Sequence, residues 1–158
     1  MHSRVWIYQG NRDFTDAEKT GILSKGNLFL GGWQAHKVPV RSSIDIRYNR
    51  FIIILADEKH AAPGGCSIDA SVHFIKSLEA EFSLILLDRT SMAYRTGGKI
   101  KIIPLSDLYK KISTGEITDD TIVFNNLVHD KAGLENEWEV PLKNSWHKTL
   151  QGNVPGLR

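Results

Sequence analysis

Residues 43–56 read SIDIRYNRFIIILA and predict two strands joined by a tight turn. The first part, 43–48, alternates polar and apolar residues, which is typical of a strand with one face in water. Asn49 and Arg50 follow as a plausible turn. Residues 51–56 are apolar at every position, so we expect both faces of this strand to be buried. The stretch therefore predicts a hairpin whose second strand lies in the middle of a sheet.

The segments on either side of this hairpin extend the pattern. Residues 4–8 predict a strand, and Thr15 with Glu18 forms a capping box that starts a first helix, which its glycines predict to be loose or kinked. A second helix is expected from Ser67, and residues 84–87 predict a last strand. The order strand, helix, strand, strand, helix, strand is typical of ferredoxin-like folds. The sequence thus predicts an α+β fold whose ferredoxin-like core has an antiparallel sheet with both helices on one face.

The second half of the chain predicts a small α+β appendage. Gly97 and Gly98 lie between two strand-like segments and predict a hairpin. A short helix over 105–112 and a strand over 121–124 are expected to follow. We therefore expect three parts: the core in residues 1–90, the appendage packed on it in 91–150, and a flexible tail in 151–158.

Composition excludes several classes of protein. The chain has 158 residues, 41% hydrophobic and 24% charged, with a formal net charge of +2, so disorder and coiled coil are excluded. The longest apolar run, 51–56, is far shorter than the roughly 20 residues that cross a bilayer. The basic residues are scattered, which predicts no nucleic-acid partner. The single cysteine and the absence of a recognisable signal peptide predict a cytoplasmic protein.

Gly64, Gly65 and Cys66 form the stretch with the clearest chemistry. Two glycines followed by a helix expose backbone N–H groups that favour an anion, and the same field favours a thiolate. Cys66 is therefore a candidate nucleophile, with His60 or His73 as its base. The other interpretation is a small buried side chain. We expect the sulfur to pack under the sheet, because cysteine is among the most often buried residues.

The same helix offers a weak candidate metal site. Cys66, Asp69 and His73 follow one another at offsets of three and four, with His60 as a further ligand from the loop. The pattern lacks the paired Cys-x-x-Cys spacing of structural zinc sites, and a solvated helix face is the other interpretation. The sequence predicts neither a bound metal nor a cofactor.

Two resemblances bear on function. The stretches IDIRYNRFIIILAD, GGCSID, ITDDTIVFNNLV and WEVPLKNSWHK are similar to a family of small bacterial proteins of unassigned function, often labelled ABC-transporter ATPase. That label implies a Gly-x-x-x-x-Gly-Lys-Ser/Thr phosphate loop, which this sequence does not contain. Residues 105–146, with TGEITDDTIVF and Trp138, resemble the second half of GYF-type modules, although the Gly-Tyr-Phe triplet is missing. This second resemblance implies a peptide-binding or domain-binding role.

The sequence therefore favours a cytosolic binding or scaffolding module without catalysis. Its partner is expected to be a protein or a small anionic ligand near Gly64, Gly65 and Cys66. The first alternative is a thiol-dependent enzyme that uses Cys66 at a helix N-terminus. The second alternative is an ATPase-associated protein without a nucleotide site of its own, as the family label implies.

Overall fold

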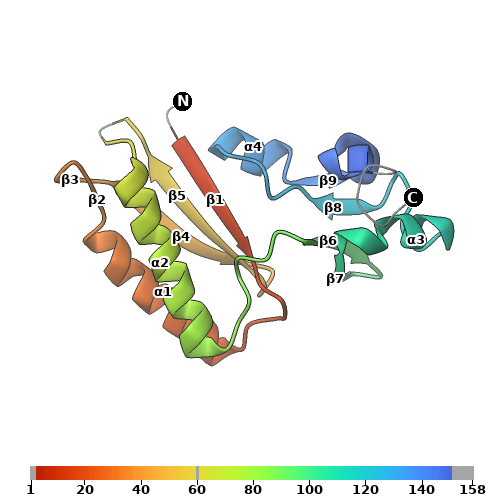
Figure 1. Cartoon of the computed structure of the whole chain (residues 1–158), viewed down its shortest axis with the longest axis horizontal. Helices are drawn as coiled ribbons and strands as arrows, with labels where there is room; N and C mark the ends of the chain where they lie inside the picture. The colour runs from red at the N-terminus through yellow and green to blue at the C-terminus, as the bar shows by residue number, and fades with distance from the viewer. Residues whose placement is uncertain (1–2, 60, 151–158) are drawn as a thin grey trace. The chain divides into compact units, whose positions relative to one another are not determined.

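The computed structural model describes residues 3–59 and 61–150 (Figure 1). The chain divides into two compact units, the first made of Met1–Leu87 and His129–Lys131, the second of Asp88–Val128 and Ala132–Arg158. The division thus falls after Leu87, and three residues from the second half belong to the first unit. The predicted tail, 151–158, lies outside the described residues.

The first unit is α+β, with a three-stranded antiparallel sheet and two long helices. Its elements are β1 (Ser3–Gln9), α1 (Asp16–Gly31), the short β2 (Gln34–Ala35) and β3 (Val38–Pro39), β4 (Arg41–Arg47), β5 (Phe51–Asp57) and α2 (Gly65–Phe82). The strand order is β1-β5-β4, with Ile54 opposite both Trp6 and Ile44. The apolar β5 is therefore the central strand, as its sequence predicts.

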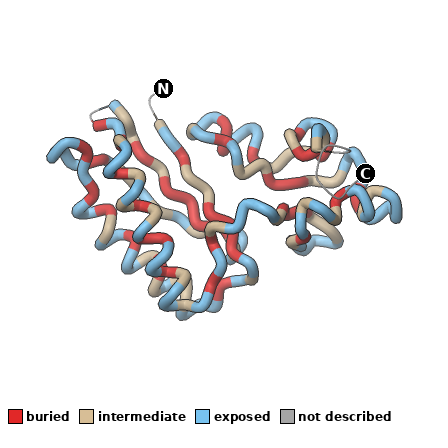
Figure 2. Tube along the Cα trace, in the orientation of Figure 1, coloured by how far each residue is buried: buried red, intermediate tan, exposed pale blue. Residues whose placement is uncertain are grey.

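Both helices of this unit cover the same face of the sheet. Ile52 and Ile54 of β5 belong to one buried cluster with Ile22 of α1 and Ile75 of α2. Figure 2 shows this pattern as buried segments along the central strand and at intervals along the helices. The predicted placement of both helices on one face is confirmed.

Helix α1 begins where the sequence predicts but is not broken by its glycines. Thr15 Oγ1 accepts from Glu18 N, and the Glu18 carboxylate accepts from Thr15 N, which completes the capping box. The helix then runs for 16 residues. A Cβ at Gly26 would lie 2.5 Å from Ile44 Cδ1, and one at Gly21 would lie 2.7 Å from Phe82. These glycines let β4 and α2 approach the helix closely, so the prediction of a loose helix was wrong.

Residues 84–87, predicted as the fourth strand, pair with no strand. Side chains accept hydrogen bonds from the backbone amides of this segment instead. Asn11 Oδ1 accepts from Ile85 N, and the Glu79 carboxylate accepts from the amides of Leu86 and Leu87 at 2.8 and 3.3 Å. The segment is buried at alternate positions, but its hydrogen bonds go to a loop and a helix. The four-stranded ferredoxin-like sheet is therefore not completed.

The second unit has a four-stranded antiparallel sheet of order β7-β6-β8-β9. Its elements are β6 (Ser91–Thr96), β7 (Lys99–Pro104), η1 (Leu105–Asp107), α3 (Leu108–Ser113), β8 (Ile122–Phe124), α4 (Lys131–Asn136, whose first residue belongs to the first unit), β9 (Glu139–Pro141), η2 (Leu142–Asn144) and η3 (Trp146–Leu150). Gly97 and Gly98 turn the β6–β7 hairpin at φ of +55° and +77°. The predicted hairpin, short helix and strand are all present.

None of the helices in the described part of the chain is both long and apolar enough to span a bilayer.

Candidate functional site

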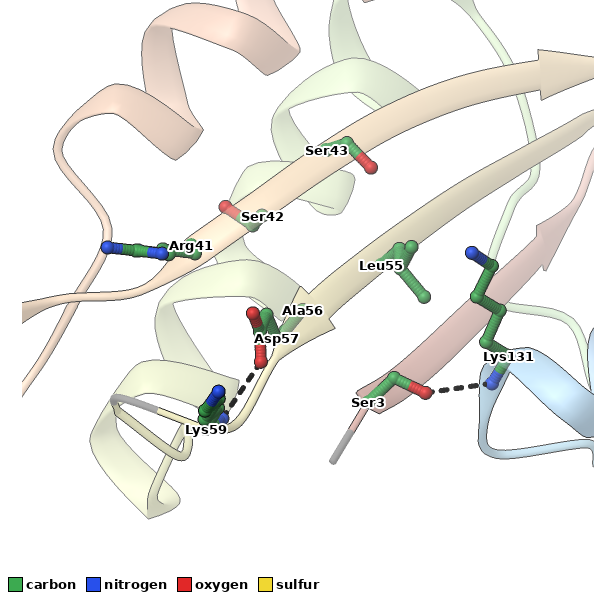
Figure 3. Close-up of a pocket in the computed structure, with 9 residues that line it drawn as sticks. All are labelled: Ser3, Arg41, Ser42, Ser43, Leu55, Ala56, Asp57, Lys59 and Lys131. Atoms are coloured by element: carbon green, nitrogen blue, oxygen red, sulfur yellow. Dashed lines mark hydrogen bonds between the residues drawn. The ribbon is translucent and has the colours of Figure 1, made fainter. Parts of the chain in front are cut away.

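Three cationic residues line a hollow at one end of the first unit's sheet. Arg41, Lys59 and Lys131 line a hollow of about 700 Å³ where β1 and β4 begin and β5 ends (Figure 3). We call it the basic hollow. All three side chains are exposed, and within residues 3–59 and 61–150 none of them forms an ion pair. Their charges are therefore available to a ligand.

The rest of the lining adds hydroxyl groups, an apolar floor and one carboxylate. The hydroxyls belong to Ser3, Ser42 and Ser43, and the apolar part is formed by Leu55 and Ala56. The carboxylate is that of Asp57, which lies opposite both Ser3 and Arg41 in the sheet register. Asp57 Oδ1 accepts from Lys59 N at 2.9 Å, so the carboxylate shapes the turn after β5. With three cations against one carboxylate, the basic hollow favours an anion.

A short return of the chain brings Lys131 to this site. His129 O accepts from Val5 N at 2.9 Å, and Ser3 Oγ accepts from Lys131 N at 3.0 Å (Figure 3). These two bonds hold residues 129–131 along the outer edge of β1. Sequence reasoning missed the basic hollow, because its cations are separated by up to 90 positions and no local motif marks them.

The predicted site around Cys66 lies in a second hollow of about 670 Å³. Cys66 is exposed, so the expectation of a buried sulfur was wrong. Its neighbour Ser67 takes the inward position: Ser67 Oγ donates to Gln34 O at 2.7 Å, and Ser67 O accepts from Trp33 Nε1 at 2.8 Å. Because α2 begins at Gly65, these bonds fix its first turn with Ser67 inside and Cys66 outside.

The candidate bases and ligands are not gathered around the sulfur. His73 is exposed seven residues along α2, about 10 Å of helix from Cys66. His60 lies outside the described residues. His36, which sequence reasoning missed, lines the same hollow, and its Nε2 lies 3.8 Å from where a Cβ on Gly64 would be. No residue type or spacing in the sequence marks His36 as a neighbour of Cys66.

The candidate metal group is also not assembled. In the part of the chain that the structure describes, no three His, Cys, Asp or Glu side chains are placed to hold a metal ion. Cys66, Asp69 and His73 are each exposed along two turns of α2. The helical rise spreads them along α2, so the three side chains do not converge on one point.

Comparisons with known proteins add no assignment to this geometry. No family model, no curated protein and no solved structure matches the chain. The two resemblances described above therefore stay predictions.

Proposed function

We propose that the protein is a binding module that takes an anionic group in the basic hollow. The observation that carries this proposal is that Arg41, Lys59 and Lys131 line one hollow, none with an ion-pair partner among the described residues. Exposed cations that form no ion pair keep their full attraction for an incoming anion. The proposal moves the anion site away from Gly64 and Gly65, where sequence reasoning placed it.

The lining has the groups that an organic anion needs. The planar guanidinium of Arg41 suits a carboxylate or a phosphate, and Lys131 adds a compact charge on the other side of the sheet end. Ser43 is exposed and can donate a hydroxyl hydrogen bond. Half-buried Leu55 offers apolar surface to the body of the ligand. The best fit is an anion that also carries an apolar part.

Citrate is a suitable first probe of this site. We expect saturable shifts of the Ser42, Ser43 and Lys131 amide signals in NMR titrations at low salt. Lys131→Gln should weaken binding by about fivefold, whereas Lys76→Gln, an exposed cation on α2, should leave it unchanged. Amide shifts that rise linearly with citrate concentration would contradict the proposal. So would shifts that neither Lys131→Gln nor Arg41→Gln changes.

Thiol chemistry at Cys66 ranks second, supported by the exposure of its sulfur. Within the described residues no hydrogen bond connects this sulfur to a base, which is why binding ranks first. The two functions are separated by the rate of iodoacetamide labelling at pH 7. A rate above that of a model thiol, lowered by His36→Ala, would favour the enzyme.

Two further sequence predictions, the family label and the ferredoxin-like core, belong to this proposal. A cytoplasmic binding module without a phosphate loop agrees with the family label only if it is a partner of an ATPase. Because the phosphate loop is missing, we expect ATP and magnesium to leave the melting temperature of the protein unchanged. The first unit is best described as a ferredoxin-like core that lacks its fourth strand. The order β1-β5-β4 and the helices on one face support this description.

A further inference from the structure

We propose that residues 129–131 form a strap that opens locally and that an anion in the basic hollow closes onto β1. This inference rests on the anion-binding function proposed above and gives the regulation of that site. The strap bonds to the edge of β1 through its backbone and supplies Lys131 to the hollow. Anion binding and strap closure therefore favour each other, because coupling between two equilibria is reciprocal.

Most of the strap is exposed to solvent. Two hydrogen bonds join its backbone to β1: His129 O accepts from Val5 N, and Ser3 Oγ accepts from Lys131 N. His129 and Lys131 are exposed, and Asp130 is half-buried. A segment that buries so little opens at a lower cost in free energy than the sheet to which it is attached. We therefore expect the strap to open while β1 stays paired with β5.

Lys131 is the residue through which an anion acts on the strap. Its side chain lines the hollow and extends from the strap toward Leu55 (Figure 3). Within residues 3–59 and 61–150 its ammonium group forms no ion pair, so a closed strap adds a free cation to the hollow. An open strap carries this cation away and leaves Arg41 and Lys59. An anion therefore binds the closed form more tightly and shifts the population toward it.

The strap also lies at a distinctive point of the chain. Val128 before it and Ala132 after it belong to the second unit, whereas the strap itself belongs to the first. Closure therefore fixes the place where the chain enters the first unit for the second time. It also gives Val5 N its acceptor, so a bound anion keeps the outer edge of β1 covered.

The affinity that Lys131 supplies sets the size of the coupling. We expect Lys131→Gln to weaken citrate binding about fivefold, and the open strap lacks the same cation. A ligand shifts an equilibrium only by the ratio of its affinities for the two states. Saturating citrate should therefore lower the open fraction of the strap about fivefold and no further.

Hydrogen exchange of the Val5 amide, followed by NMR, measures strap opening. This amide donates to the strap, whereas the amide of Trp6 points toward β5, because successive amides of a strand alternate in direction. Without ligand, Val5 should exchange about tenfold faster than Trp6. Citrate should slow the exchange of Val5 until the effect levels off at about fivefold. Sodium chloride at the same ionic strength should not reproduce this slowing.

Two pairs of variants separate strap closure from affinity. In Lys131→Gln, citrate held by the remaining groups should leave Val5 exchange unchanged, whereas Arg41→Gln at saturating citrate should still show the slowing of about fivefold. Ser3→Ala removes the acceptor of Lys131 N and should speed Val5 exchange about fivefold without ligand. Ser43→Ala removes a hydroxyl from the same hollow but none from the strap, and should leave this rate unchanged.

The outcomes distinguish strap closure from the function on which it rests. If citrate saturates the Ser42 and Ser43 signals but leaves Val5 exchange unchanged, strap closure is overturned and the anion site stands. Val5 exchange as slow as that of Trp6 would show that the strap opens only together with the sheet, and would also overturn the inference. The absence of any saturable shift with citrate would overturn the anion site and strap closure with it.

Discussion

The two units bury polar groups in different ways. In the described part of the first unit, the buried polar side chains are Gln9, Ser67 and Ser71, and no histidine, carboxylate or cation is buried. The second unit buries His147 beside Ser145 and holds Tyr94 against the Glu116 carboxylate. The buried core of the first unit is therefore mostly apolar, and this packing is insensitive to pH. The second depends partly on groups whose protonation matters.

Removing core volume from the first unit should give the largest effect. Ile75 is fully buried between α2 and the sheet, so Ile75→Ala should lower the free energy of unfolding by about 3–4 kcal/mol. Urea denaturation measures the loss, and exposed Lys76→Ala on the same helix should change it by less than about 0.5 kcal/mol. A cost below about 1 kcal/mol would show that the apolar core matters less than we argue.

Acid should affect the second unit before the first. Burial lowers the pKa of His147 from 6.5 to about 4, because charging the ring inside the protein is unfavourable. The unfolded chain therefore binds a proton between these values that the folded chain does not. Stability from this residue is full above pH 6.5 and falls as the pH drops to 4, by up to about 3 kcal/mol.

Hydrogen exchange at pH 7 and at pH 4.5 locates this effect. Peptides from the second unit should lose protection at pH 4.5, while those covering α2 and β5 should change much less after correction for intrinsic rates. His147→Gln should flatten the pH dependence, and exposed His73→Gln should not. Equal loss of protection in both units would contradict the proposed difference in their sensitivity to acid.

Removing the hydrogen bonds of residues 84–87, which pair with no strand, should have an effect of intermediate size on stability. Glu79→Ala leaves the amides of Leu86 and Leu87 without their acceptor and should cost about 2 kcal/mol. Glu79→Gln keeps a carbonyl oxygen and should cost about half as much. Thermal unfolding of both variants gives the comparison. If Glu79→Ala costs nothing, water replaces the carboxylate and the segment depends on its leucines alone.

The smallest expected effect concerns the hydroxyl of Tyr94. Burial and the neighbouring Glu116 carboxylate raise its pKa to about 12, so the hydroxyl stays protonated and donates throughout the neutral range. Tyr94→Phe should lower stability by about 1 kcal/mol. Tyr109→Phe on the exposed face of α3 is the matched control and should change stability little. Identical melting temperatures for both variants would show that the Glu116 contact is energetically neutral.

Local signals predicted the elements that depend on local geometry. The Thr15 cap and the Gly97-Gly98 turn need only neighbouring residues, and each is where the sequence places it. Residues 84–87 failed because an apolar run becomes a strand only when another strand is free to pair, and here Asn11 and Glu79 supply the hydrogen bonds. Such long-range partners leave no periodic trace in the sequence.

The candidate site shows the same limit. The position of Cys66 depends on which residue of the first helical turn points inward, and Ser67 decides this through bonds to residues 33 positions away and more. The basic hollow needs Lys131 to return to β1, which no local pattern indicates. Sequence reasoning could therefore name single residues with chemistry but not the set that the fold brings together.

The return of residues 129–131 also determines how the protein can be divided. Because the chain enters the first unit twice, no single cut separates the two units into complete halves. A fragment that ends at Leu87 keeps every strand of its sheet but loses the acceptor of Val5 N, so both outer strands of the sheet become bare. Bare strands invite association between copies. Separate expression of the first unit therefore requires residues 129–131 to be grafted back through a linker, or supplied as a peptide in trans.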